Sequence, residues 1–167
     1  MKFVVDTNVP VVANGKSQQA SPECVKTCAV RLNELTRKGK LVLDDKWLIL
    51  KEYMANLRSS GQPGPGDAFL KWALTNLKNP SRCNLVSITP TNSSFREFPP
   101  APALQSFDPN DKKFIAVANV HPEKPPILQA VDTGWWSMRE HLRRAGIIVD
   151  FLCEADIRSA AGKRKRK

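Results

Sequence analysis

The chain has 167 residues, of which 41% are hydrophobic, 25% are charged and 7% are aromatic, as in an ordinary single-domain globular protein. No stretch approaches the roughly 18 consecutive apolar residues of a membrane-spanning helix, which excludes a transmembrane protein. The formal charge of +10 is unusually high and half of it lies in residues 163–167, so a basic body with a basic tail predicts a polyanionic partner such as nucleic acid.

Short apolar runs typical of buried strands alternate along the chain with longer stretches that carry an apolar stripe at helical spacing. In chain order, the predicted elements lie at residues 2–6 (strand), 22–38 (helix), 41–43 (strand), 46–59 (helix), 68–77 (helix), 85–88 (strand), 109–120 (helix), 127–131 (strand), 136–145 (helix) and 147–152 (strand). This alternation predicts a three-layer α/β/α fold with a central, mainly parallel sheet of four to five strands.

Several helix starts carry capping signals, and two segments between the elements are typical of loops. Ser21 is expected to cap the helix that begins at Pro22, and Asp45 and Asp67 are expected to cap the next two helices. The glycine- and proline-rich segment 61–66 breaks the chain between helices, and residues 89–106 predict a long surface loop.

The ends of the chain bear on domain limits and location. We expect one folded domain over residues 1–158 and a basic, disordered tail over residues 159–167. The first apolar run is interrupted by Asp6 and Asn8, so the N-terminus does not resemble a signal peptide, and a cytoplasmic location is expected.

Four cysteines, Cys24, Cys28, Cys83 and Cys153, are scattered along the chain. The Cys24–Cys28 spacing has no matching second pair, which argues against a structural zinc site and favours packing in the core. The pattern indicates no disulfide framework, and a reducing compartment is the expectation that follows.

Acidic residues stand at the ends of two apolar strands. Asp6 ends the first strand and Asp132 follows the strand 127–131. In a parallel sheet, ligand sites lie beyond the carboxyl ends of the strands, so the two side chains are candidates for one site. The alternative is that each aspartate simply caps the turn or helix that follows it.

Two further acidic residues lie within helical patterns. Glu52 falls among apolar neighbours, away from the polar stripe of its helix, where the alternative is a structural ion pair with an arginine. Asp111 falls at the third position of the helix 109–120, on the face that packs inward, whereas Asp108 before Pro109 fits an N-cap. We therefore take Asp111 as a candidate ligand and Asp108 as an auxiliary carboxylate.

Carboxylates that converge repel one another, and a divalent cation is the usual remedy. Hard oxygen donors without nearby histidine or cysteine favour Mg²⁺ or Mn²⁺ over zinc. The candidate ligands are Asp6, Glu52, Asp111 and Asp132, with Glu52 either a direct ligand or the group that orients a water bound to the cation. Thr7 and Asn8 would position a carboxylate or a phosphate group of the polyanionic partner.

The segment Phe3-Val4-Val5-Asp6-Thr7-Asn8, the mid-chain Glu52, the segment from Asp111 to Ala118 and the strand-terminal Asp132 resemble, in order and spacing, the PIN domain. The resemblance covers nearly the whole chain. It implies a ribonuclease that uses Mg²⁺ or Mn²⁺ to cleave phosphodiester bonds. Many bacterial members are toxins of toxin–antitoxin pairs, so an antitoxin or other regulatory protein and a homodimer are the implied protein partners.

Alternative functions remain open on the sequence. A nuclease effector that cleaves DNA, or an RNA-binding module with little catalytic activity, would fit the same charge and fold. A phosphatase of the haloacid-dehalogenase type would need a second aspartate where this chain has Asn8.

Basic and aromatic residues near the candidate site are the candidates for nucleic-acid binding. The basic ones are Lys112, Lys113, Arg139, Arg143 and Arg144, and for each the alternative is an ordinary solvated surface. Trp135 and Trp136 would either stack on bases or belong to the core.

Overall fold

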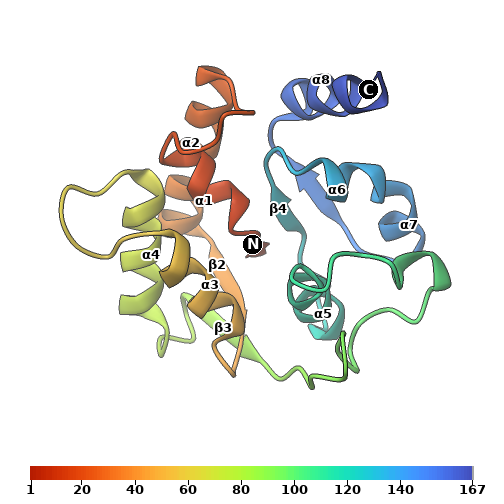
Figure 1. Ribbon diagram of the computed structural model, residues 1–167. Coiled ribbons are helices and arrows are strands. Elements are labelled where there is room, and N and C mark those ends of the chain that lie inside the picture. The colour runs from red at the N-terminus through yellow and green to blue at the C-terminus, as the bar shows by residue number, and fades with distance from the viewer. Residues whose placement is uncertain (167) are drawn as a thin grey trace.

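The computed structural model describes residues 1–166 and contains one five-stranded parallel sheet (Figure 1). The strands are β1 (Lys2–Val5), β2 (Lys40–Asp44), β3 (Cys83–Val86), β4 (Ile127–Gln129) and β5 (Val149–Phe151), in the spatial order β3-β2-β1-β4-β5. Every neighbouring pair is parallel. The predicted α/β/α fold with a parallel sheet is confirmed.

The strand order reverses direction between β1 and β4. From β1 the chain proceeds outward through β2 to β3, and then crosses back to place β4 on the other side of β1. Val4 pairs with Ile127 and Val5 with Leu128, which places Asp6 and Gln129 at the same level beyond the paired residues. In open parallel sheets, ligands bind at the carboxyl ends of the strands at such a reversal.

Helices occupy both sides of the sheet. They are α1 (Asn8–Ala13), α2 (Pro22–Lys38), α3 (Leu48–Asn56), α4 (Pro65–Asn76), the short 3-10 helix η1 (Pro102–Leu104), α5 (Lys112–Val120), α6 (Thr133–Ser137), α7 (Arg139–Arg144) and α8 (Glu154–Lys165). In Figure 1, α1 to α4 gather on the left and α5 to α8 on the right, with the strands between them. Helix α5 lies against β1, β2 and β4, so it crosses the strands that flank the reversal.

The start of α2 follows the local sequence signals. Ser21 is the N-cap and its hydroxyl accepts from Cys24 N at 3.2 Å, with Pro22 as the first helical residue. The helix ends at Lys38, directly before Gly39. The buried stripe consists of Cys24, Cys28, Leu32 and Leu35, as the spacing predicts.

Helix α1 was not predicted, and it begins directly after the first strand. Its six residues include Pro10, which the first turn of a helix tolerates because amide hydrogens there have no partner within the helix. Asn14, at the end of α1, ties it to α4: its side chain donates to Asp67 Oδ1 at 2.9 Å and accepts from Gly66 N at 2.8 Å.

Asp67 lies inside α4 rather than at its N-cap, which is Gly64. Its carboxylate accepts from Arg58 N at 2.8 Å and from Gly64 N at 3.0 Å. Burial raises the pKa of Asp67, but these hydrogen bonds and the one from Asn14 outweigh it, so the pKa lies below the usual value. Asp67 therefore stabilises the junction between α1, α3 and α4 as a charged group.

The other predicted cap, Asp45, was also wrong, since the N-cap position of α3 is Trp47 and the neighbouring Asp44 binds the first amides. Asp44 is the carboxylate that caps α3, and it accepts from Leu48 N at 2.8 Å and Ile49 N at 3.0 Å. Asp44 is 1% exposed at the end of β2, so a buried strand-terminal aspartate can be purely structural when backbone amides satisfy it.

Two helical boundaries in the second half of the chain differ from the prediction. Helix α5 begins at Lys112 rather than at residue 109, because Asp108 forms a turn in which its Oδ1 accepts from Asn110 N at 2.9 Å. The predicted helix 136–145 is two short helices, and the first begins at Thr133 because Asp132 Oδ1 accepts from Gly134 N at 2.8 Å.

The segment 89–106, expected to be a surface loop, is partly packed into the core. Phe98 and Leu104 are buried. Glu97 fixes the start of the segment, because its carboxylate accepts from Thr89 N at 2.7 Å and from the Thr89 hydroxyl at 3.0 Å. The segment thus forms an ordered route from β3 to α5.

The basic segment is helical as far as Lys165 where we expected disorder, and Lys167, the last residue of the expected tail, lies outside the described residues. Helix α8 runs through residues 159–165, so the expected limit at residue 158 falls inside a helix. Ile157 anchors α8 and is fully buried. Glu154 and Asp156 in the first turn and the basic residues in the last turn have the charges that stabilise a helix dipole.

The expectation of no disulfide was wrong. Cys24 and Cys153 are bonded, with a Cα–Cα distance of 5.4 Å and a sequence separation of 129. Cys28 Sγ lies 3.8 Å from Cys153 Sγ. The inference of a reducing compartment rested on the absence of such a bond and therefore loses its support.

Among the described residues, no helix is long and apolar enough to cross a bilayer.

Candidate acidic site

The four acidic residues singled out from the sequence line one hollow of about 250 Å³. They belong to different parts of the fold: Asp6 follows β1, Glu52 lies on α3, Asp111 precedes α5 and Asp132 lies in the loop after β4. The full lining is Asp6, Thr7, Asn8, Val11, Glu52, Asn56, Asp111 and Asp132. The hollow lies at the carboxyl ends of β1 and β4, where the strand order reverses.

Asp6 is the most deeply buried member, at 4% exposed. Its Oδ2 accepts from the side-chain amide of Gln129 at 2.7 Å and from Asn8 N at 3.2 Å. Burial raises the pKa of Asp6 well above its usual value, and the neighbouring charge of Asp111 raises it further. The carboxylate is thus oriented by two donors but not electrostatically neutralised.

Gln129 was not identified as a site residue from the sequence. It is fully buried on β4, and besides donating to Asp6 its Oε1 accepts from Ala130 N at 2.8 Å. The available signal was a single polar residue inside the otherwise apolar run 127–131, where a buried amide requires partners.

Asp111 occupies the N-cap position of α5, but its side chain caps no amide of that helix. The carboxylate faces the hollow instead. Burial raises the pKa of Asp111 to about 7, and the charges of Asp132 and Asp108 add to the effect. An acidic group held this far from its usual pKa is typical of a functional site.

Asp132 is both a helix cap and a residue of the candidate site, the two interpretations that its sequence position allowed. It caps α6 through Gly134 N, and it lines the hollow beside Asp111. Asp108 makes the turn contact described above and does not line the hollow. Its charge still contributes to the raised pKa of Asp111, in keeping with an auxiliary position.

Glu52 forms an ion pair, although with a lysine rather than an arginine. Lys113 Nζ lies 2.6 Å from Glu52 Oε2, and the side chains are 13% and 28% exposed. Helix α3 is less buried than its composition suggested, since Trp47 and Met54 are exposed. Lys113 therefore belongs to the acidic site and is not a free surface cation.

Thr7 and Asn8 connect the two strand ends. Asn8 Oδ1 accepts from Val131 N at 2.8 Å, which ties the turn after β1 to the loop after β4. The buried Thr7 Oγ1 has no hydrogen-bond partner although it lines the hollow. A hydroxyl in that condition is available to a ligand.

The predicted nucleic-acid-binding residues differ in their exposure and contacts. Lys112 is 3% exposed, donates to Gln105 O at 3.0 Å and lies over the Phe98 ring, so assigning it to nucleic-acid binding was wrong. The three predicted arginines on α7, Arg139, Arg143 and Arg144, are exposed. The Arg139 guanidinium lies 4.1 Å from the centroid of the Trp136 ring, and Arg143 pairs with Glu140 at 2.9 Å.

Of the two tryptophans considered for base stacking, Trp135 belongs to the core, as the alternative interpretation held, and Trp136 packs against Phe151. Trp135 is fully buried against Phe107, with ring centroids 5.0 Å apart, and Trp136 is 9% exposed.

The donor set of the hollow fits a hard divalent cation such as Mg²⁺ or Mn²⁺. It offers carboxylate oxygens whose mutual repulsion Lys113 relieves only in part, and an unpartnered hydroxyl at Thr7. No three of the four carboxylates place oxygens within 4.8 Å of one another in the described chain, so holding an ion requires side-chain rotations. Three cysteines do meet that distance, but two of them share the disulfide.

Neither family models, nor curated proteins, nor solved structures gave a match to this chain.

Proposed function

We propose that this protein is a hydrolase of the PIN-like kind, a metal-dependent nuclease that cleaves phosphodiester bonds of RNA. The observation that carries the proposal is the convergence of Asp6, Glu52, Asp111 and Asp132 on one hollow at the strand reversal. A role as a helix cap or in a surface ion pair would account for the position of any one of these acidic residues. It does not explain four acidic groups, two with strongly raised pKa values, sharing one cavity.

In this proposal Asp6, Asp111 and Asp132 hold Mg²⁺ or Mn²⁺, with Glu52 at the edge. The ion supplies Lewis-acid activation of water and offsets negative charge on the phosphate. Gln129 and Asn8 N keep the Asp6 carboxylate oriented.

The remaining groups act on the phosphate and the water. The Thr7 hydroxyl, buried and unpartnered, donates to a phosphate oxygen that enters the hollow. Lys113 pairs with Glu52 while the site is empty of substrate, and its ammonium then turns to the phosphate. Glu52 Oε2, released from Lys113, accepts the proton of the attacking water.

Cleavage of DNA by the same site, or RNA binding without cleavage, is the competing proposal. A role as the toxin of a toxin–antitoxin pair, an antitoxin partner and a homodimer rest on the resemblance to PIN domains alone. The proposal is therefore confined to the nuclease chemistry.

The test is incubation of the purified protein with end-labelled single-stranded RNA and single-stranded DNA in Mn²⁺, in Mg²⁺ and in EDTA. RNA should be cleaved internally with either ion and remain intact in EDTA. Asp6→Asn and Asp111→Asn should each lower the cleavage rate at least about 100-fold. Cleavage in EDTA, or full activity of both variants, would contradict the proposal.

A second readout does not depend on turnover. Mn²⁺ should raise the melting temperature of the wild-type protein, because a ligand that binds only the folded state stabilises it. The shift should be reduced in Asp111→Asn, whose fold the circular dichroism spectrum verifies. Asp45→Asn, which removes an exposed carboxylate outside the hollow, is the matched control.

A further inference from the structure

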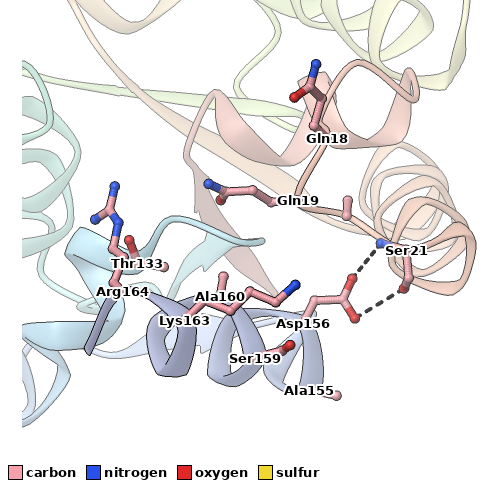
Figure 2. A pocket seen from close by; sticks show the side chains of 11 residues that line it. Gln18, Gln19, Ser21, Thr133, Ala155, Asp156, Ser159, Ala160, Lys163 and Arg164 are labelled. Carbon is pink, nitrogen blue, oxygen red and sulfur yellow. Dashed lines mark hydrogen bonds between the residues drawn. The ribbon is translucent and has the colours of Figure 1, made fainter. Parts of the chain in front are cut away.

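A groove lies beside the acidic hollow, between the segment that leads into α2 and helix α8 (Figure 2). Its volume is about 580 Å³. Gln19 extends across it from one wall, where Gln18 also lines it but points away from α8, and Lys163 and Arg164 extend from α8 on the other.

The groove offers hydrogen-bond donors suited to an anionic ligand. The lining contains the exposed cations Lys163 and Arg164, the side-chain amides of Gln18 and Gln19, and the hydroxyl of Ser159. The single carboxylate of the lining, Asp156, is already used by the opposite wall, since its oxygens accept from Ser21 N at 2.6 Å and from the Ser21 hydroxyl at 3.1 Å. Its contacts hold the two walls together (Figure 2) and reduce its repulsion of an anion.

The walls are also linked covalently. The Cys24–Cys153 disulfide joins the first turn of α2 to the residue that precedes α8. The bonded cysteines are each three residues along the chain from a lining residue, Cys24 from Ser21 and Cys153 from Asp156. The groove is thus present before any ligand arrives, which lowers the entropic cost of binding.

The groove continues toward the acidic hollow. Thr133 lines the groove and Asp132, the preceding residue, lines the hollow. An extended polymer that leaves the hollow past Asp132 therefore meets the groove at Thr133. A small anion would fill only part of this path.

We propose that this groove binds the sugar–phosphate backbone of the nucleic-acid strand on one side of the bond to be cleaved, with Lys163 and Arg164 contacting its phosphates. The inference rests on the proposed function, since the direction of the strand comes from the acidic hollow. It assigns to the basic end of the chain a defined place in substrate binding.

The test compares Lys163→Gln/Arg164→Gln with Lys71→Gln/Lys78→Gln, which removes two exposed cations at and beyond α4, outside the groove. Binding of a fluorescently labelled 12-nucleotide single-stranded RNA to the full chain is measured by anisotropy in EDTA, where the site does not cleave. The groove variant should bind about tenfold more weakly than the wild type, and the control variant should bind like the wild type.

Salt dependence gives an independent measure. Losing two phosphate contacts should reduce the slope of log Kd against log salt by about 1.4, because each contact to a single strand contributes about 0.7. A groove variant whose affinity and slope equal those of the control overturns the inference, and so does a wild type that does not bind RNA. Equal weakening of RNA binding in both double variants indicates general charge attraction, which would act on an acidic protein as well. That result also overturns the inference.

A small substrate separates this inference from the proposed function. Bis(p-nitrophenyl) phosphate reaches the hollow without entering the groove, so its hydrolysis in Mn²⁺ should be equal in the wild type and the groove variant. Should the wild type hydrolyse neither this compound nor RNA, the nuclease proposal fails while the EDTA binding result still decides the groove. Should the groove variant lose hydrolysis of the small compound, the groove residues act on the hollow itself and the inference is overturned.

Discussion

The side-chain amide of Gln129 donates to Asp6 Oδ2 at 2.7 Å, across the two adjacent strands that flank the reversal of the sheet. Both residues are buried, and this hydrogen bond lowers the pKa of a carboxylate that burial and its neighbours raise. Gln129 therefore keeps Asp6 oriented and more easily ionised, which is the condition for holding a cation.

Replacing Gln129 by leucine should weaken the cation site without removing any carboxylate. We predict a rise of about 10- to 100-fold in the Mn²⁺ concentration needed for half-maximal activity, since partners of metal ligands typically contribute that much. The measurement is RNA cleavage as a function of Mn²⁺. Gln105→Leu removes an exposed amide outside the hollow and should leave the Mn²⁺ dependence unchanged.

Lys113 competes with a cation for Glu52, because its ammonium lies 2.6 Å from Glu52 Oε2. We predict that Lys113→Met lowers the melting temperature of the metal-free protein by roughly 2–4 °C, the effect of about 1 kcal/mol in a chain of this size. The same variant should bind Mn²⁺ more tightly. Calorimetric melting with and without Mn²⁺ measures both effects, and weaker Mn²⁺ binding would show that the pair does not compete. Lys51→Met, on the exposed side of α3, is the control.

Asp67 should make stability depend on acidity. Its folded-state pKa is lowered, so its charge stabilises the folded protein above pH 4, and this contribution disappears as the pH falls through the folded-state pKa. We predict that Asp67→Ala costs about 1–3 kcal/mol at pH 7 and clearly less at pH 3. Urea unfolding at both values measures the difference, and a constant cost would assign the effect to packing alone.

The Cys24–Cys153 bond closes a loop of 129 residues, so breaking it should matter for stability. We predict that Cys24→Ser, or a reducing agent, lowers the free energy of unfolding by about 2–5 kcal/mol. Alkylation of the unfolded, unreduced protein followed by mass spectrometry should label Cys28 and Cys83 only. Labelling of all four cysteines would contradict the bond, and Cys83→Ala controls for loss of a buried thiol.

Local signals in the sequence were sufficient for most of the fold. The parallel sheet between helices follows from the alternation of strand and helix patterns, and the two aspartates after β1 and β4 follow from the ends of apolar runs. Glu52 and Asp111 could be found because an acidic residue on the buried side of a helix needs a reason to be there.

The features that the sequence did not reveal depend on residues far apart in the chain. Gln129 and Asp6 are separated by 123 residues, and the bonded cysteines by 129. Lys112 and Lys113 are neighbours with the same chemistry, yet one is buried against Phe98 and the other reaches the hollow. The packing of the segment 89–106 determines which of the two lysines is buried.

The pairing of Val5 with Leu128 has one more consequence. Side chains alternate between the two faces of a strand, so sliding β4 by a single residue along β1 would present Leu128 or Ala130 to Asp6 instead of an amide. Such a protein would keep its sheet, its helices and every acidic residue, and would still lack the oriented carboxylate. The chemistry proposed for this chain is thus encoded in the alignment of two short central strands as much as in the identity of its acids.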